Sequence, residues 1–317
     1  MDLVLVMNPT AGRGKGRRTA AAIAEALRDD GHDVAEFIAG PGRHEEGVGR
    51  ALSTADAAIV VGGDGTLHHM ADLLIATETP VYHVPLGTEN LFAREFAMNA
   101  KIETLREALR KGEVQKVDVA RCAGRAFILM CSLGFDAAVV ARLARIRGAS
   151  ISHLSYVKPI LAEAIAFKPP RFIIEADGER LVDDRRGLLI VANCRQYGAR
   201  LDPAAEACMT DAMLDMVFLP FTSRLGLIRM ALAARTRRLR QNPRVIARRA
   251  RRVTVETPEG PTPIQMDGEA VLFRSGEAPS LPSRLEITIE PAALRVLAPG
   301  GAITPPSATT AAIRKAS

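Results

Sequence analysis

An apolar run passes directly into a glycine-rich turn at Ala57-Ala58-Ile59-Val60-Val61-Gly62-Gly63-Asp64-Gly65-Thr66. Consecutive apolar residues with branched side chains are typical of a strand that is buried on both faces. Three glycines within four positions let the backbone come close to a ligand, because no Cβ stands in the way. A helix that starts at such a turn offers unpaired N–H groups and the positive end of its dipole. The pattern therefore predicts a phosphate site.

Asp64 interrupts this otherwise neutral turn. A carboxylate repels phosphate unless a metal ion lies between them or a hydroxyl donates to it, so we expect Mg²⁺ near Asp64. The alternative is a tight turn without a ligand, capped by Asp64 or Thr66.

Strand, loop and helix alternate on both sides of this turn. Extended runs are expected at 2–7, 33–38, 57–61 and 81–84, and helices near 17–28, 44–53, 66–76 and 90–96. This alternation implies βαβ crossovers and a parallel sheet that is covered on both faces.

The pattern changes after about residue 112. Extended runs separated by long connections follow, and only the stretches near 151–167 and 224–240 are expected to be helical. We therefore predict a doubly wound parallel-sheet domain over residues 1–118. An antiparallel β-sandwich over 119–298 follows it, with its last residues packing back on the first domain, and a disordered tail rich in Ala, Ser, Thr and Pro covers 304–317.

Two further loops follow predicted strands. In Pro85-Leu86-Gly87-Thr88-Glu89-Asn90, Thr88 is expected to cap the next helix, which leaves Asn90 to bond a sugar, base or phosphate. The turn Asn8-Pro9-Thr10-Ala11-Gly12 follows the first strand. Ligands of open parallel sheets bind at the carboxyl ends of the strands, so we expect the three loops to form the walls of one site. The Gly12-x-Gly14-x-Gly16 run is no dinucleotide fingerprint, because Arg17 stands where that motif needs glycine.

Four motifs together carry a family resemblance. They are Gly62-Gly63-Asp64-Gly65-Thr66, Pro85-Leu86-Gly87-Thr88-x-Asn90-x-Phe92-Ala93-Arg94, Gly134-Phe135-Asp136-Ala137 and Asp267-Gly268-Glu269. From about residue 2 to 298 the chain resembles the diacylglycerol-kinase catalytic family, which includes bacterial lipid kinases and sphingosine kinases. The first motif is shared with NAD kinases, whereas the Pro-Leu-Gly-Thr-x-Asn block favours the lipid-kinase branch. The resemblance implies a nucleotide domain, a β-sandwich and an active site in the cleft between them.

The resemblance also assigns roles to single residues. ATP or its metal would be contacted by the glycine turn, by Thr88 and by Asn90, and Asn8 would line the nucleotide pocket. The residues of the turn in these roles are Gly62, Gly63, Asp64, Gly65 and Thr66. Across the cleft, Glu269 is the favoured base for the acceptor hydroxyl, and Asp267 would hold metal or orient the base. A hairpin turn without catalytic function is the alternative for Asp-Gly-Glu.

A second magnesium site is implied near Asp211. In the family, the corresponding carboxylate holds a structural ion together with two backbone carbonyls, which here belong to Cys208 and Met213. Ala212 replaces the usual glycine.

Two further departures lie in the motif loops. His68-His69 stands where the family usually has Asn-Glu, and Leu91 stands where it usually has Asp. Adjacent residues on a helix point in different directions, so the two histidines are not expected to bind one metal ion.

Charge is distributed unevenly along the chain of 317 residues, whose formal net charge is +6. Eleven arginines and no acidic residue lie between Phe221 and Val253, with Leu225, Ile228 and Leu232 among them. This pattern predicts an amphipathic helix at an anionic bilayer. A packed helix with a solvated basic face and a nucleic-acid site are the alternatives.

The remaining features bound the class of protein. No apolar run reaches about 18 residues and the first residues lack the features of a signal peptide, so we expect a cytoplasmic protein that associates peripherally with membranes. The four cysteines are far apart and are expected to be buried thiols. A homodimer is the default assembly.

The function predicted from the sequence is an ATP-dependent lipid kinase. It would transfer the γ-phosphoryl group to a lipid hydroxyl, with diacylglycerol or a related glycerolipid as the expected acceptor. Two alternatives stay open: a kinase for a soluble substrate such as NAD, and a catalytically silent homologue that binds lipid or nucleic acid.

Overall fold

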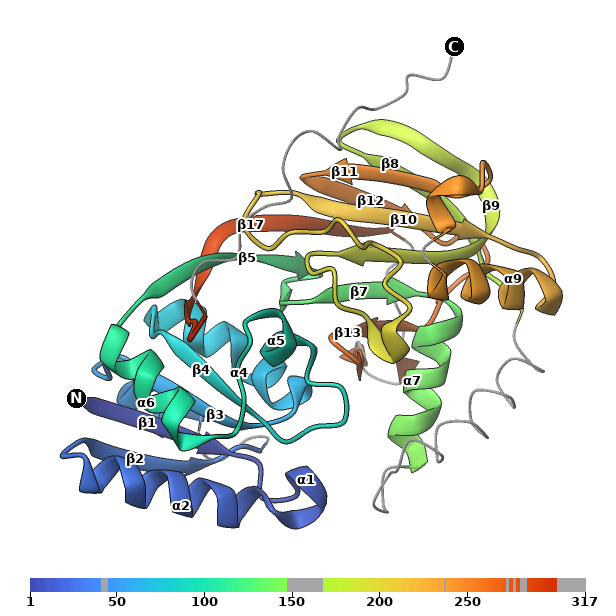
Figure 1. Cartoon of the computed structure of the whole chain (residues 1–317). Helices are drawn as coiled ribbons and strands as arrows, with labels where there is room; N and C mark the ends of the chain where they lie inside the picture. The colour runs from blue at the N-terminus through green and yellow to red at the C-terminus, as the bar shows by residue number, and fades with distance from the viewer. Residues whose placement is uncertain are drawn as a thin grey trace.

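The computed structural model describes residues 1–40, 45–146, 168–236, 238–271, 274–275, 278–279 and 284–300. The predicted helix near 151–167 and the predicted tail over 304–317 lie outside these residues. Figure 1 shows a parallel-sheet domain at the N-terminal end and a larger, mainly antiparallel domain beside it.

The first domain is a parallel sheet with the strand order β4-β3-β1-β2. Its strands are β1 (Asp2–Met7), β2 (Asp33–Ile38), β3 (Ala57–Gly62) and β4 (Val81–Pro85). All six residues of β3 are buried, as expected for a central strand covered on both faces. The helices are α1 (Ala11–Gly14), α2 (Gly16–Asp29), α3 (Glu45–Leu52), α4 (Asp64–Thr77), α5 (Leu91–Glu95) and α6 (Ile102–Lys111).

The second domain is a β-sandwich. One layer contains β5 (Val114–Cys122), β6 (Arg125–Phe127), β8 (Arg171–Ala176), β12 (Arg252–Glu256) and β17 (Arg284–Leu297). The other contains β7 (Met130–Leu133), β10 (Leu214–Pro220), β11 (Ile246–Ala250), β13 (Ile264–Met266) and β14 (Glu269–Ala270). Pairing within each layer is antiparallel.

The long strand β9 (Glu179–Ala192) joins the two layers. Its first half pairs with β8, and its second half, from Gly187, pairs with β10. A Cβ on Gly187 would lie 2.4 Å from the carbonyl oxygen of Leu219, so the close approach at this point needs glycine. Between the layers, the rings of Phe172 and Phe218 pack edge to face with their centroids 6.0 Å apart.

The remaining elements are helices and short pieces around the sandwich. They are α7 (Phe135–Ile146), η2 (Gly198–Arg200), α9 (Arg224–Arg235), η3 (Leu239–Gln241), β15 (Arg274–Ser275) and β16 (Ala278–Pro279). The predicted helix over 224–240 is therefore shorter, because α9 ends at Arg235. The four cysteines are buried free thiols, as predicted.

The last strand connects the two domains. Along β5 the strand β17 is antiparallel, and near its end Val296 pairs in parallel with Val81 of β4. The predicted fold class, a parallel-sheet domain followed by an antiparallel β-sandwich, is confirmed.

Candidate active site

The glycine turn lies where β3 ends and α4 begins. Gly63 is the N-cap residue of α4, and its Cα lies so close to the second loop that a Cβ on Gly87 would be 2.7 Å from it. The N–H of Leu86 donates to the carbonyl oxygen of Gly62 over 2.7 Å. The two loops after β3 and β4 therefore meet backbone to backbone, as their position at the carboxyl ends of neighbouring strands predicts.

Asp64 holds these two loops together. Its Oδ2 accepts a hydrogen bond from the N–H of Leu91 at 2.9 Å, and its Oδ1 accepts one from the N–H of Phe92 at 3.1 Å. It thereby pairs two of the N–H groups that α5 cannot satisfy internally. Burial raises the pKa of Asp64 to about 6, although these two N–H groups act in the opposite direction.

The expected cap by Thr88 is wrong, because α5 begins only at Leu91 and Asn90 occupies the N-cap position. Asn90 has a φ of 48° and closes its own loop: its Oδ1 accepts from the N–H of Gly87 at 2.7 Å, and its Nδ2 donates to the Gly87 carbonyl oxygen at 2.8 Å. Thr88 is exposed beside it. Nucleotide contacts by Thr88 and Asn90 stay a prediction. The side-chain amide of Asn90 already forms two hydrogen bonds with the backbone of Gly87.

Asn8 lies against the same turn. Its Nδ2 donates to Oγ1 of the buried Thr66 over 3.4 Å, and its Oδ1 accepts from the N–H and the hydroxyl of Thr10 at 3.0 and 2.8 Å. The loops after β1, β3 and β4 are thus in one place. That the three loops bind one ligand stays a prediction.

His83 is a positioning residue that the sequence analysis missed. It is fully buried in β4, and one of its ring nitrogens, Nε2, lies 3.1 Å from the carbonyl oxygen of Gly62. Burial lowers the pKa of His83 to about 4, so the ring is neutral near pH 7 and Nε2–H donates to that carbonyl. The sequence could have indicated this contact, because a lone histidine inside an apolar strand needs a buried hydrogen-bond partner.

Asp267 comes from the other domain, in the turn between β13 and β14, and its side chain is buried. Oδ1 accepts from the N–H groups of Leu129 and Met130 at 2.7 and 3.1 Å, and Oδ2 accepts from the N–H of Ile128 at 2.8 Å. Nδ1 of His68 lies 2.9 Å from Oδ2. Asp267 therefore fixes the connection between β6 and β7 and holds a histidine of α4, which belongs to the other domain.

The contact with Asp267 determines the protonation of His68. Burial opposes a positive charge on the ring, but the carboxylate of Asp267 outweighs it and raises the pKa of His68. His69 is exposed, and its ring packs edge to face against that of His68, with the centroids 5.6 Å apart. That the two histidines bind no common metal ion stays a prediction.

Glu269 approaches the glycine turn from the second domain. A Cβ on Gly65 would lie only 2.3 Å from Oε1 of Glu269, so the carboxylate rests on the first turn of α4 and would have to move if residue 65 carried a side chain. The Asp-Gly-Glu turn and the Gly-Gly-Asp-Gly-Thr turn, about 200 residues apart in the chain, thus meet where the two domains touch. An active site in the cleft between the domains stays a prediction.

The Gly134-Phe135-Asp136-Ala137 motif forms a buried polar cluster next to this wall. Asp136 accepts from the hydroxyls of Ser132 and Tyr197, the latter at 2.6 Å, and Nε2 of Gln265 donates to Oγ of Ser132 at 2.8 Å. Burial raises the pKa of Asp136. The sequence analysis missed Tyr197 and Gln265, which come from distant segments. The cluster anchors the start of α7 against β7 and β13.

The residues near Asp211 form an ion pair. Asp211 contacts the guanidinium of Arg249 through Oδ2 and accepts from the N–H of Met213 through Oδ1 at 3.1 Å. Ala212 adopts a φ of 57°, and its N–H donates to Asp118 at 2.7 Å, so the turn is left-handed although alanine stands at this position. A structural Mg²⁺ held by Asp211 and the carbonyls of Cys208 and Met213 stays a prediction. The geometry does not favour it, because Arg249 already supplies the positive charge.

Among the residues that the structure describes, no group of three or more His, Cys, Asp and Glu side chains could hold a metal ion. A nucleotide-bound Mg²⁺ usually takes only one or two protein carboxylates and obtains its other ligands from phosphates and water. Asp64 and Glu269 are the carboxylates beside the glycine turn, so these residues fit such an ion only together with a nucleotide.

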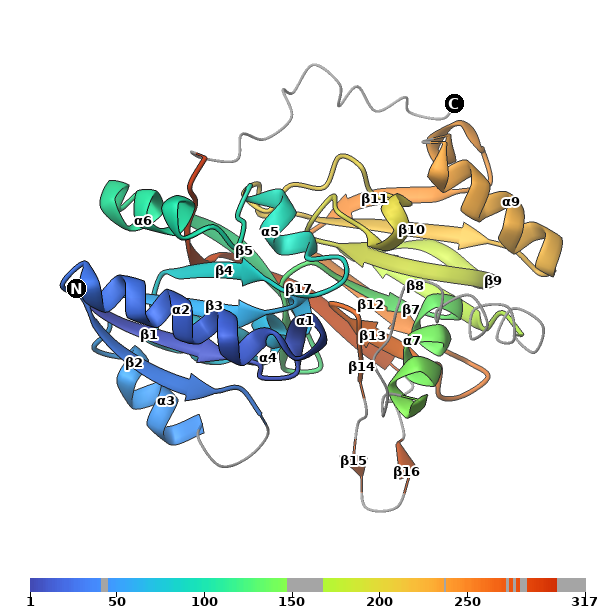
Figure 2. The ribbon, with the colours of Figure 1, turned by 60° about the horizontal axis from the view of Figure 1, so that its bottom comes forward.

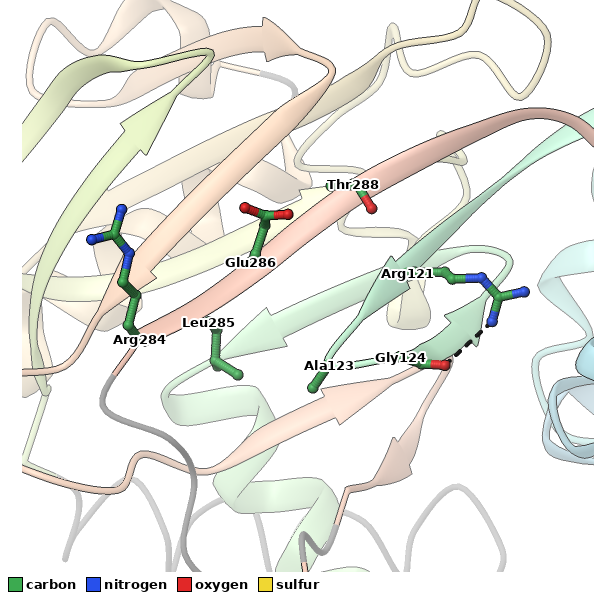
Figure 3. A pocket seen from close by; sticks show the side chains of 7 residues that line it. All are labelled: Arg121, Ala123, Gly124, Arg284, Leu285, Glu286 and Thr288. Atoms are coloured by element: carbon green, nitrogen blue, oxygen red, sulfur yellow. Dashed lines mark hydrogen bonds between the residues drawn. The ribbon is translucent and has the colours of Figure 1, made fainter.

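A surface hollow lies beside β17, apart from the four motifs (Figure 3). Arg121 lies at its edge and binds Asp72 of α4 at 2.8 Å and Glu290 of β17 at 2.7 Å, which ties the two domains together. The hollow is lined by Arg121, Ala123, Gly124, Arg284, Leu285, Glu286 and Thr288. It contains no residue of the four motifs.

The fold and these contacts define a two-domain protein with a phosphate-type loop in one domain and a carboxylate in the other. Its similarity to known proteins identifies the family. Residues 2–122 match the family model described as the diacylglycerol kinase catalytic domain, and residues 130–298 match the one described as the YegS C-terminal NAD kinase beta sandwich-like domain. The chain belongs to the diacylglycerol kinase family of lipid kinases.

Curated relatives and solved structures agree with this assignment. The chain is 30% identical over 302 residues to a diacylglycerol kinase of Mycobacterium tuberculosis, covering 92% of this chain and 93% of the relative. It is 24% identical over 291 residues to one of Bacillus subtilis, covering 90% and 95%. A crystal structure of a diacylglycerol kinase from Bacillus anthracis has the same fold, with a TM-score of 0.66, 19% identity, and 94% and 96% of the two chains covered.

Within the described part of the chain, every helix is too short or too polar to span a bilayer.

Proposed function

We propose that this chain is an ATP-dependent lipid kinase that phosphorylates the hydroxyl of diacylglycerol or a related glycerolipid. The observation that carries the proposal is the contact of Glu269 with the first turn of α4 at Gly65. A carboxylate is thereby held next to the helix start that is suited to bind phosphate. The family and the relatives named diacylglycerol kinase support the same reaction class.

The reaction follows from this arrangement. ATP would lie with its phosphates against the turn Gly62–Thr66, and Mg²⁺ bound to the nucleotide would neutralise the phosphate charge, with Asp64 as its protein carboxylate. The acceptor oxygen attacks the γ-phosphorus as the bond from phosphorus to the β,γ-bridging oxygen breaks. The hydroxyl proton passes to Glu269, and ADP leaves with the electron pair of the broken bond.

Asp267 acts indirectly in this scheme. Its carboxylate is committed to three backbone N–H groups and to His68, so it shapes the turn that carries Glu269. This refines the role inferred from the sequence, in which Asp267 held metal or oriented the base.

Transfer of labelled γ-phosphate from Mg·ATP to lipids in mixed micelles tests the proposal. The panel contains diacylglycerol, monoacylglycerol, phosphatidylglycerol and a sphingoid base, and NAD serves as the soluble acceptor. We expect a labelled glycerolipid, and a loss of about 100-fold or more in Glu269→Gln with ATP binding retained. Glu103→Gln, on the exposed face of α6, is the matched control. Labelled NAD would favour the soluble-substrate kinase, and no transfer from a folded protein that binds ATP would favour the silent homologue.

A further inference from the structure

Exposed apolar side chains are concentrated on one helix. Six large apolar residues are exposed among the described residues, and three of them lie on α9: Leu225, Ile228 and Leu232, with exposed fractions of 55%, 61% and 62%. With about 100° of rotation per residue, these three side chains fall within a stripe about 60° wide. We call them the α9 stripe.

The opposite side of α9 faces the protein core. Met230 and Ala234 are buried, and Leu227 packs against the same core cluster. These residues point roughly 130–170° away from the centre of the stripe. The helix has therefore satisfied its packing requirement with one face, and the stripe is a second apolar face turned to solvent. The stripe is not explained by folding of this chain, because exposing it has a cost in water.

Arginines border the stripe on both sides. The helical rotation places Arg229 on one flank and Arg224 and Arg235 on the other, and all three are exposed. Arg238 and Arg244, in the connection that follows, are exposed as well. No acidic residue occurs between Phe221 and Val253.

The structure divides the arginine-rich segment into two parts. On β11 and β12, Arg248, Arg249 and Arg252 form ion pairs with Glu179, Asp211 and Glu286. Their charges are therefore largely balanced within the protein. The arginines on and just after α9 lie around the exposed apolar stripe.

The position of α9 fits a docking surface. In both views it lies at the end of the molecule away from the N-terminal domain (Figures 1 and 2). The helix α7 lies toward the same end and packs against β13 and β14, the strands that flank the turn with Asp267 and Glu269. A membrane at this end would meet the acceptor side of the cleft before the nucleotide side.

We infer that α9 is the membrane-docking element, with Leu225, Ile228 and Leu232 entering the interface of an anionic bilayer and the flanking arginines binding lipid phosphates. An apolar stripe between cations is the pattern of a helix lying in the membrane interface. Charge complementarity favours anionic lipid over a second copy of this chain, whose α9 would bring arginines against arginines. The inference rests on the proposed function in one respect, namely that the acceptor is taken from a membrane.

Vesicle flotation of the full chain tests this inference. The vesicles contain phosphatidylcholine alone or with 30 mol% phosphatidylglycerol, at low and high salt. We expect binding only with phosphatidylglycerol and weaker binding at high salt. The double variant Ile228→Ser/Leu232→Ser should lose affinity by about tenfold or more, and Arg229→Gln/Arg238→Gln by about fivefold per arginine.

Matched controls change exposed residues elsewhere. Ile38→Ser/Val114→Ser removes exposed apolar side chains, and Lys101→Gln/Arg110→Gln removes exposed charges of the first domain. Both should bind vesicles as the unchanged protein does. The inference is overturned if the α9 variants also bind like the unchanged protein, or if the controls lose as much affinity as they do.

Two further outcomes would assign the stripe to another partner. If light scattering finds a dimer that the Ile228→Ser/Leu232→Ser variant converts to a monomer with unchanged vesicle binding, the stripe is a subunit interface. If the α9 variants lose affinity for single-stranded RNA but not for vesicles, the arginines serve nucleic acid. Each result overturns the inference.

Failure of the docking surface and failure of the proposed function are distinguishable. Phosphoryl transfer to a short-chain diacylglycerol, dissolved below its micelle concentration, needs no bilayer. We expect the α9 variants to keep this activity and to lose transfer to long-chain diacylglycerol in vesicles. If the protein binds vesicles through α9 but transfers phosphate to no lipid, the proposed kinase function is refuted and the docking surface is supported. If it transfers phosphate to lipid but does not bind vesicles, the docking surface is refuted and the kinase function is supported.

Discussion

Asp64→Asn should change the pH dependence of stability in the nucleotide-free protein. Asp64 ionises with a pKa of about 6 in the folded state, against an ordinary value of 3.8, mainly because it is buried between the two loops. Between these two pH values the folded chain holds the proton more tightly than the unfolded chain does. The resulting stability is fully present below pH 4 and is lost as the pH rises through 6.

The displaced pKa sets the size of the effect. The difference between 3.8 and about 6 corresponds to at most about 3 kcal/mol of unfolding free energy. We treat this value as an upper limit, because Asp64 keeps partial contact with solvent. His83, whose pKa is lowered to about 4 by burial, acts over the same range in the opposite direction. Only a comparison of variants therefore isolates Asp64.

Urea unfolding at pH 4 and pH 7.5, in the presence of a chelator, provides the measurement. Between these pH values the unchanged protein should lose up to about 3 kcal/mol more than Asp64→Asn does. Asp29→Asn, on the exposed side of α2, is the matched control and should follow the unchanged protein. Equal pH dependence in the unchanged protein and in Asp64→Asn would refute the conclusion that the fold holds this carboxyl in a desolvated position.

Three further substitutions test other parts of the site. Asp267→Ala leaves the buried N–H groups of residues 128–130 without their acceptor. Urea titration should show a loss of about 3–5 kcal/mol in unfolding free energy. A loss below about 1 kcal/mol would contradict the anchoring role. His83→Gln removes a buried imidazole that resists protonation in the folded state. As the pH is lowered from 6.5 to 4, the unfolding free energy of this variant should therefore fall less steeply than that of the unchanged protein. Equal slopes would argue against a neutral buried imidazole. Ala212→Gly replaces an alanine in a left-handed conformation by a residue that adopts it without strain. Calorimetry should find a gain of about 0.5–1 kcal/mol in unfolding free energy. A lower melting temperature would show that the turn carries no strain.

Local patterns were sufficient to predict much of the fold. The strand and helix around Gly62–Thr66 follow from a buried apolar run and a glycine turn, and alternation of strands and helices predicts the parallel sheet. The helices α6 and α7 were not predicted. The second strand-rich part was predicted by type only. Its last strand, β17, continues to Leu297, because a bulge between Glu290 and Leu294 accommodates Pro291.

The candidate site was predicted by its motifs but not by its contacts. Asp64 pairs with N–H groups 27 and 28 residues away, and His68 pairs with Asp267 at a separation of 199 residues. No local periodicity encodes such partners, since they depend on how the two domains meet. For the same reason Asn90 was expected to face a ligand, whereas its amide closes its own loop. The domain boundaries at residues 118 and 119 stay a prediction.

The route of β17 has a consequence for biosynthesis. A ribosome releases the N-terminal domain first, yet the neighbour of β4 in the finished sheet is the end of β17, near Val296. Until those last residues emerge, β4 is an open sheet edge, and such edges pair with other chains. We expect a nascent chain that stops before residue 284 to require a chaperone, and a gene truncated there to yield aggregate instead of a smaller kinase.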